Sequence, residues 1–295
     1  MSHYSGNIDN FGVDAVSLTG PLEAQLKAVQ GAGFSQVMLA PSDLVGHPGG
    51  VEAAVAAVRA SALRVTGFQA LRDFEGLFDQ LHDRKIDMAK SMLQMCQALG
   101  CRLLLVQSST LTQASTDNRK VAKDLRKLAM LAIPMNIRIA YSAVSDAHSV
   151  KDFGQAWDRI CEADVPNLGI GLAGNTSSLF AEGICPDDLD ILDPDKVFLV
   201  QLADFLWHEA SGKPFRVFPG EGLHSRNIAA LVKQLHDLGY RGDYSFDVCN
   251  SDYQQMPPAD VAQRARRAAV WLGEGVLQRS VPLPNHIRLR RLANP

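Results

Sequence analysis

The feature that most constrains the fold of this chain is an alternation of short apolar runs with longer amphipathic segments. Eight runs rich in Val, Ile, Leu or Phe are strand candidates: GVDAVSL, SQVMLA, LRVTGFQAL, RLLLVQSS, IRIAYSAV, NLGIGLA, KVFLVQLA and DYSFDV. Most segments between them carry apolar residues at i, i+3, i+4 and i+7, which predicts amphipathic helices. The pattern therefore indicates repeated strand–helix units.

These units indicate parallel strands wrapped by helices, because most of the strands are too apolar to expose one face to water. The alternative, an open doubly wound sheet, lacks its usual GxGxxG turn after the first strand. A length of 295 residues suits one barrel. We therefore expect a single α/β domain, a (β/α)8 TIM barrel, over residues 1–276. Residues 277–295 are expected to form a C-terminal arm, either a solvated tail packed on the barrel or a subunit contact.

Composition narrows the classes of partner. The net charge of -3 gives no electrostatic reason to expect nucleic acid or an anionic membrane. The five cysteines are odd in number and lack CxxC pairing, which argues against a disulfide framework and a zinc ribbon and favours a reducing cytoplasm. No signal peptide and no run of about 18 apolar residues is present. A small neutral or anionic ligand fits these observations.

The candidate site residues stand where predicted strands end, because barrels place their chemistry on the loops that follow the strands. Arg72 ends the third strand, Gln201 lies on the seventh, and Asp247 lies on the eighth. The long loop after the seventh strand contributes His208 and Arg216. The sixth strand runs into LGIGLAGNTSSL, in which no side chain can ionise.

Several stretches resemble a known family. The segments GFQALRDFEGL, VFLVQLAD, FRVFPGEG and GYRGDYSFDVCNSDY are similar to those of the xylose-isomerase-like sugar phosphate isomerase/epimerase barrels. Within that superfamily they most resemble 3-dehydroshikimate dehydratases, and the likeness extends from the first strand to the helix ending near Trp271. The resemblance implies a TIM barrel that binds a small hydroxy-carbonyl acid or sugar. If the chain is an enzyme, it implies a lyase (dehydratase) or an isomerase.

The resemblance also implies where a metal would bind. The dehydratases hold one divalent metal between a Glu, an Asp, a Gln or His, and a Glu on strands five to eight, and such oxygen ligands suit Mg²⁺ or Mn²⁺. The corresponding residues here are Ser142, Ala173, Gln201 and Asp247, and Thr176 replaces a His. Two carboxylates are lost and a third is shortened. We therefore expect the metal site to be lost or weakened and no cofactor to be bound.

Two questions stay open at this point. A divalent metal such as Mg²⁺ or Mn²⁺ held by relocated ligands is the alternative to metal loss, and side chains close to strand ends that could serve are Asp146, His148, Asp204 and His208. For Arg72, the resemblance implies a clamp on a substrate carboxylate. The alternative for Arg72 is a salt bridge to Asp73 or Glu75 near the barrel rim.

The other candidates also have two interpretations. Asp247 is a general base if burial raises its pKa, or it only pairs with an arginine such as Arg216. Gln201 and Arg216 are predicted to bind substrate, and His208 is a second candidate for proton transfer.

Three hypotheses for function follow from these residues. The first is a lyase or isomerase that uses side-chain acid and base groups, the second is a catalytically inactive ligand-binding or regulatory protein, and the third is a metal enzyme with relocated ligands. All three predict a small-molecule ligand and neither nucleic acid nor membrane as partner. Barrels of this superfamily often form dimers or tetramers, and the C-terminal arm would suit a contact in such a homo-oligomer.

Overall fold

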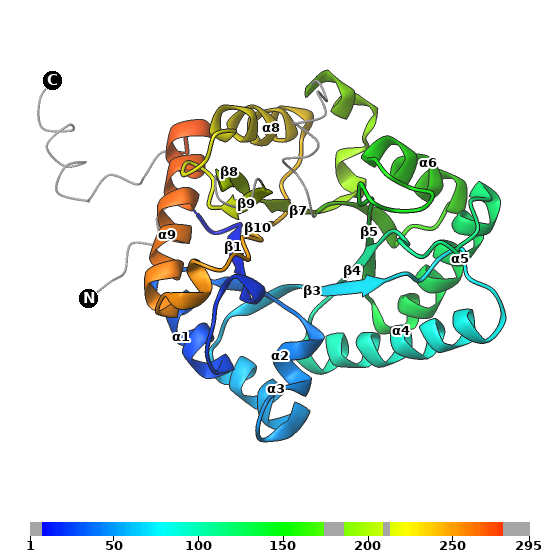
Figure 1. Cartoon of the computed structure of the whole chain (residues 1–295), viewed down its shortest axis with the longest axis horizontal. Helices are drawn as coiled ribbons and strands as arrows, with labels where there is room; N and C mark the ends of the chain where they lie inside the picture. The colour runs from blue at the N-terminus through cyan, green and yellow to red at the C-terminus, as the bar shows by residue number, and fades with distance from the viewer. Residues whose placement is uncertain (1–7, 174–185, 209–212, 280–295) are drawn as a thin grey trace, which may run out of the picture.

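Eight parallel strands form the centre of the computed structural model, which describes residues 8–173, 186–208 and 213–279. The strands are β1 Phe11–Asp14, β2 Gln36–Leu39, β3 Arg64–Arg72, β4 Leu103–Gln107, β5 Arg138–Ser142, β6 Leu168–Leu172, β7 Val197–Leu202 and β10 Tyr244–Phe246. They close into a barrel in the order β1-β10-β7-β6-β5-β4-β3-β2 (Figure 1). Each strand overlaps one predicted apolar run, so the predicted (β/α)8 barrel is confirmed.

Helices cover the outside of the barrel (Figure 1). They are α1 Leu22–Gly31, α2 Pro41–Val45, α3 Gly50–Ala60, α4 Asp79–Leu99, α5 Asn118–Ala132, α6 Phe153–Ala163, α8 Ser225–Leu238 and α9 Pro258–Val270, which continues as a π-helical segment Trp271–Val276. In α5 the buried positions include Val121, Leu125 and Leu128, which recur at helical spacing and form one apolar stripe. Burial of such stripes against the strands makes the main core.

The interior of the barrel is filled by a second, smaller cluster. Its buried members include Met38 of β2, Leu105 of β4 and Phe198 of β7. Strand β6 makes room for them with two glycines. A Cβ atom on Gly169 would lie 2.6 Å from the Phe198 ring and 2.4 Å from the Lys196 carbonyl oxygen. The glycines of LGIGL are therefore a packing requirement of the neighbouring strand.

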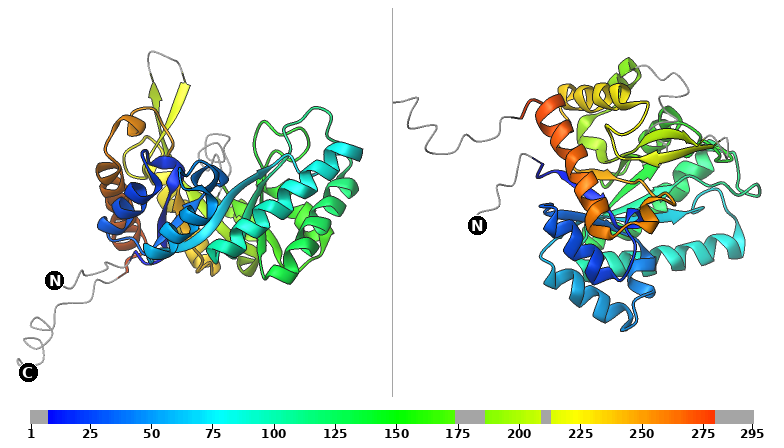
Figure 2. Two further views of the ribbon diagram at one scale, coloured as in Figure 1. Left: turned by 90° about the horizontal axis from the view of Figure 1, so that it is seen from below. Right: turned by 60° about the vertical axis from the view of Figure 1, so that its left-hand side comes forward.

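The chain after β7 differs from the predicted long loop. It forms an antiparallel hairpin of β8 Asp204–His208 and β9 Lys213–Val217, which rises from one end of the barrel (Figure 2, left). Asp204 pairs with Val217 at its base. The loop interpretation was wrong over these two segments, because β8 starts directly after a barrel strand and pairs only with a neighbouring segment, so no separate apolar run marked it.

No helix within the described ranges is both long and apolar enough to cross a bilayer. The last described helical segment ends at Val276. Most of the predicted C-terminal arm, residues 280–295, lies outside the described residues, so its role stays a prediction.

Substituting Gly169 tests the packing of β6. The Gly169→Ala variant should unfold with a free energy lower by about 1 to 3 kcal/mol, because the new methyl group must displace strand β7. Gly31→Ala is the matched control, since nothing lies within 4 Å of its added Cβ and alanine favours a helix. Denaturant unfolding of both variants checks this. Equal stabilities would contradict the packing argument.

Candidate functional site

A cavity of about 320 Å³ opens where β3, β4 and β5 end. Its walls are formed by Arg72, Asp73, Gln107, Ser108, Thr110, Val144, Asp146 and Arg216. These residues come from the ends of β3 and β4, from the loops that follow β3, β4 and β5, and from the hairpin strand β9. The end of the barrel at which strands finish is where barrel enzymes place their active sites. Two arginines and two aspartates line this small polar cavity, and a guanidinium group can bind an anionic group of a ligand.

Arg72 is exposed at the end of β3 and is a wall of this cavity. The ion pairs found among the described residues include none between Arg72 and either Asp73 or Glu75, so the alternative drawn from sequence is not formed there. Asp73 instead accepts a hydrogen bond from the Thr110 backbone N–H at 2.9 Å and lies 4.0 Å from the Lys85 ammonium. The role of Arg72 as a carboxylate clamp stays a prediction.

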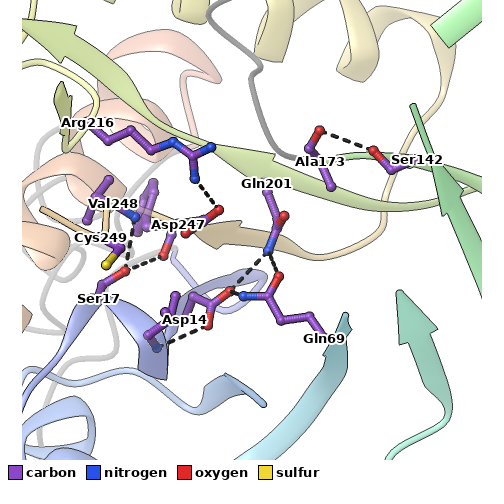
Figure 3. A network of polar contacts seen from close by, with 12 residues as sticks. Asp14, Ser17, Gln69, Ser142, Ala173, Gln201, Arg216, Asp247, Val248 and Cys249 are labelled. Carbon is purple, nitrogen blue, oxygen red and sulfur yellow. Dashed lines mark hydrogen bonds and ion pairs between the residues drawn. The ribbon is translucent and has the colours of Figure 1, made fainter. Parts of the chain in front are cut away.

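Arg216 and Asp247 are brought together at the mouth of the barrel (Figure 3). Nη1 of Arg216 lies 2.6 Å from Oδ2 of Asp247, and the two side chains are 25% and 12% exposed. This pairing was one of two interpretations of Asp247 from sequence. The proposed base role of Asp247 stays a prediction.

Gln201 lies in a buried amide–carboxylate network (Figure 3). Its Nε2 donates to Oδ2 of Asp14 at 3.0 Å and to Oε1 of Gln69 at 2.7 Å. The Gln69 side chain also donates to Asp14. Asp14 accepts a further hydrogen bond from the Val16 backbone N–H. The side-chain nitrogen of Gln201 therefore holds Asp14 and Gln69 in place below the mouth of the barrel.

Asp14 is a residue that sequence reasoning missed. It is fully buried at the end of β1, a strand from which no candidate residue was predicted. Burial, and next the negative charge of Asp247, raises the pKa of Asp14 well above its ordinary value. Asp14 is the one ionisable residue of the predicted run GVDAVSL, which was the signal that could have identified it.

The four positions that resemble a metal site do not fit a divalent cation. The Ser142 hydroxyl donates to the Ala173 carbonyl oxygen at 3.1 Å, and neither side chain supplies a charge. Gln201 uses its amide nitrogen within the network above. The only carboxylate, Asp247, is paired with Arg216, whose guanidinium would have to leave before a metal could bind. Within the described ranges no three His, Cys, Asp or Glu side chains gather as a metal cluster would require.

Asp204 has a structural task. It is fully buried and accepts hydrogen bonds from the backbone N–H groups of Phe205 at 2.7 Å, Gly222 at 3.2 Å and His224 at 2.9 Å, and from the Ser225 hydroxyl. A Cβ on Gly222 would lie 2.3 Å from the carboxylate, so glycine is needed there. The motifs VQLAD and FPGEG are thus joined through one carboxylate at the base of the hairpin.

The other candidates for relocated ligands are spread around the mouth. Asp146 lines the cavity, and His148 is exposed in the same loop. His208 is the last residue of β8 and pairs through its backbone with Lys213, but its side chain lies outside the described part of the structure. Thr176 also lies outside the described residues. Their proposed roles stay predictions.

Glu75 is a second ionisable group whose place the sequence did not reveal, since it entered only as a partner for Arg72. It is fully buried, and its Oε1 accepts hydrogen bonds from the Ser109 backbone N–H at 2.6 Å and the Tyr141 hydroxyl at 3.0 Å. Its Oε2 has no partner among the described residues. Burial raises the pKa of Glu75 to about 7.

Comparison with known proteins places this geometry among related barrels. The family model of the xylose isomerase-like TIM barrel matches residues 26–274. The chain is 31% identical to a 3-dehydroshikimate dehydratase of Pseudomonas aeruginosa over 295 aligned residues, covering 96% of this chain and 45% of that protein. It is 30% identical to a 3-dehydroshikimate dehydratase of Pseudomonas putida, covering 89% of this chain and 41% of that protein.

A solved structure also has a fold similar to that of this chain. A xylose isomerase-like TIM barrel/4-hydroxyphenylpyruvate dioxygenase fusion protein superposes with a TM-score of 0.82 at 27% identity, covering 97% of this chain and 44% of that chain. The present chain therefore spans less than half the length of these relatives.

The buried carboxyl of Glu75 should make stability depend on pH. This group has its ordinary pKa of 4.5 when unfolded and a pKa of about 7 in the fold. Between these values the unfolded state loses its proton first, so rising pH favours unfolding. The free energy of unfolding of the wild type should therefore fall relative to that of Glu75→Gln, by about 3 kcal/mol in all. Denaturant titrations between about pH 5 and pH 8 measure this, and parallel curves for the two proteins would refute it.

Proposed function

The chain belongs to the xylose isomerase-like TIM barrel family, and from this premise we propose that its cavity binds a small carboxylic acid carrying hydroxyl and carbonyl groups and dehydrates it. One observation carries the proposal: Arg72 and Arg216 both line one cavity of about 320 Å³ at the end of the barrel where the strands finish. Relatives named 3-dehydroshikimate dehydratases support this class of ligand.

The proposed roles of the cavity residues follow from their chemistry. Arg72 binds the ligand carboxylate, since a planar guanidinium matches a carboxylate with two parallel hydrogen bonds. Arg216 donates to the carbonyl oxygen, and the half-buried Gln107 amide is available to a hydroxyl. Gln201 supports the site from below through its network with Asp14. The cavity volume lies in the range of small-molecule sites.

The proposed reaction is the loss of water from a β-hydroxy ketone. A base removes the proton from the carbon next to the carbonyl, negative charge builds on the carbonyl oxygen, and the hydroxyl on the next carbon leaves as water after taking up a proton. Asp247 is the proposed base and Arg216 the proposed partner of the oxygen, because their contact at 2.6 Å places both side chains at the same point of the site. His208 of the hairpin is the proposed proton donor to the leaving hydroxyl.

We further propose that this site works without a divalent metal. Ser142 and Ala173 supply no charge, and the guanidinium of Arg216 already neutralises Asp247. A fixed cation beside the carbonyl oxygen can stabilise developing negative charge, which is the task that a metal performs elsewhere.

A second candidate function is ligand binding without turnover. The observation that favours it is the same ion pair, because Oδ2 of Asp247, an oxygen that would take the proton, already accepts a hydrogen bond from Arg216. In this case the cavity and its arginines serve recognition, and the protein acts as a sensor or carrier of the same class of acid.

We also propose a cellular compartment and an oligomeric state for the protein. The four cysteines that the structure describes are free thiols, which supports a reducing compartment such as the cytoplasm. A homo-oligomer formed through the C-terminal arm is the corresponding proposal for assembly.

Substitution of Arg72 tests ligand binding. Arg72→Gln should weaken binding of 3-dehydroshikimate by about 10- to 100-fold, because it removes a charge-assisted pair of hydrogen bonds. Arg59→Gln is the matched control, since Arg59 is an exposed arginine on α3 that does not line the cavity. Calorimetry gives the affinities, and the ultraviolet absorbance of protocatechuate gives turnover. Binding without product would support the second candidate, and no binding by the wild type would reject both.

Metal analysis tests the second part of the proposal. Protein purified without chelator should contain well below one equivalent of divalent metal, and chelator should leave turnover unchanged. The variant with Ser142→Glu, Ala173→Asp and Asp247→Glu should gain measurable Mn²⁺ affinity, because it restores three carboxylate ligands. Asp247→Glu alone is the control, as it adds no charge. A stoichiometric metal in the wild type would instead indicate relocated ligands.

A further inference from the structure

The segment RDFEG that follows Arg72 is anchored to the loop after β4. Oδ1 of Asp73 accepts the Thr110 backbone N–H at 2.9 Å, and Oε1 of Glu75 accepts the Ser109 backbone N–H at 2.6 Å. Two acidic side chains on one short segment thus accept hydrogen bonds from the consecutive backbone amides of Ser109 and Thr110. Backbone amides held by carboxylates form strong, charge-assisted hydrogen bonds when the carboxyl group is ionised.

The same segment is fixed from its other side. Phe74, between the two acids, is fully buried and its ring lies 5.6 Å from the His82 ring. The Gly76 backbone N–H donates to Oδ2 of Asp124 of α5 at 2.9 Å, and the Gly76 carbonyl oxygen accepts the Ser115 N–H at 2.8 Å. RDFEG is therefore a rigid support rather than a free loop.

The loop after β4 in turn holds the loop after β5. The Ser108 hydroxyl donates to the Val150 carbonyl oxygen at 2.8 Å and accepts the Val144 backbone N–H at 2.9 Å. The His148 backbone N–H donates to the Ser109 carbonyl oxygen at 2.8 Å. These hydrogen bonds connect three segments that line the ligand cavity. The segments contribute Arg72, Thr110 and Asp146 to its walls.

Burial of Glu75 lowers the stability of the folded protein, which distinguishes it from an exposed side chain that only anchors a loop. It has no exposed surface, and its neighbours include no cation that pairs with it among the described residues. Groups that face it are the Tyr141 hydroxyl of β5 and the carboxylate of Asp73, while the Asp124 carboxylate on α5 is occupied by Lys120. Buried ionisable groups that lower the stability of the folded protein are typical of functional sites.

We propose that Asp73 and Glu75 are positioning residues that hold residues 108–110 as a preformed wall of the ligand cavity, so that Arg72 meets the ligand in one fixed geometry. The inference rests on the proposed function, because it concerns the same cavity. Preformed walls avoid the entropic cost of ordering a loop on binding, so loss of Glu75, which does not line the cavity, should weaken affinity without removing any group that touches the ligand.

Hydrogen exchange tests the anchoring without any ligand. In Glu75→Ala the backbone amide of Ser109 should exchange at least about tenfold faster, because its acceptor is gone. Glu75→Gln should stay within about threefold of the wild type, since its amide oxygen can accept the same two hydrogen bonds. Asp73→Ala, at a partly exposed position, repeats the test should Glu75→Ala fold poorly. Asp243→Asn, which alters an ion pair with Arg64 at the other end of the barrel, is the control.

Calorimetry with 3-dehydroshikimate then tests the consequence for binding. We expect the dissociation constant to rise about tenfold or more in Glu75→Ala, and to stay near the wild-type value in Glu75→Gln and Asp243→Asn. Unchanged exchange in both alanine variants, or faster exchange with unchanged affinity, would overturn the inference. Failure of the wild type to bind this acid would instead reject the proposed function, and the exchange rates would still decide whether the anchors hold the loop.

Discussion

Pairing of β1 with β10 closes the barrel, and the chemistry of its mouth depends on that seam. The register places Val13 opposite Phe246, so the next residues of the two strands, Asp14 and Asp247, emerge side by side at the same end. Two buried carboxyl groups in such positions repel each other, which is part of the reason that the pKa of Asp14 is raised. The fold therefore has to supply compensating groups at this point.

Those compensating groups come from three other parts of the barrel. Gln69 of β3 and Gln201 of β7 donate to Asp14, and Arg216 reaches Asp247 from the hairpin that leaves the barrel after β7. Buried polar groups are tolerated when their hydrogen bonds are made within a connected network. At this mouth the two carboxyl groups are balanced by two amides and one guanidinium.

The sequence was sufficient for the barrel because its information is local. Each strand needs only an apolar run and each helix only an apolar stripe, and both periods are visible along the chain. The candidate site needed more. That Arg216 meets Asp247 was one of two readings open from sequence, and only the geometry of β9 brings them together. Asp14 and Glu75 could not be interpreted without register and loop contacts, because their partners lie far along the chain: Gln201 for Asp14, and Ser109 for Glu75.

The hydrogen bonds that Asp204 accepts at the base of the hairpin have a further consequence for how the length and sequence of the hairpin can change. It fixes both ends of the hairpin at the rim, where β8 begins and where the turn after β9 carries Gly222. Arg216 stands one residue from that fixed base, opposite Phe205. The outer end of the hairpin can therefore be lengthened, shortened or exchanged as a unit while the arginine keeps its place.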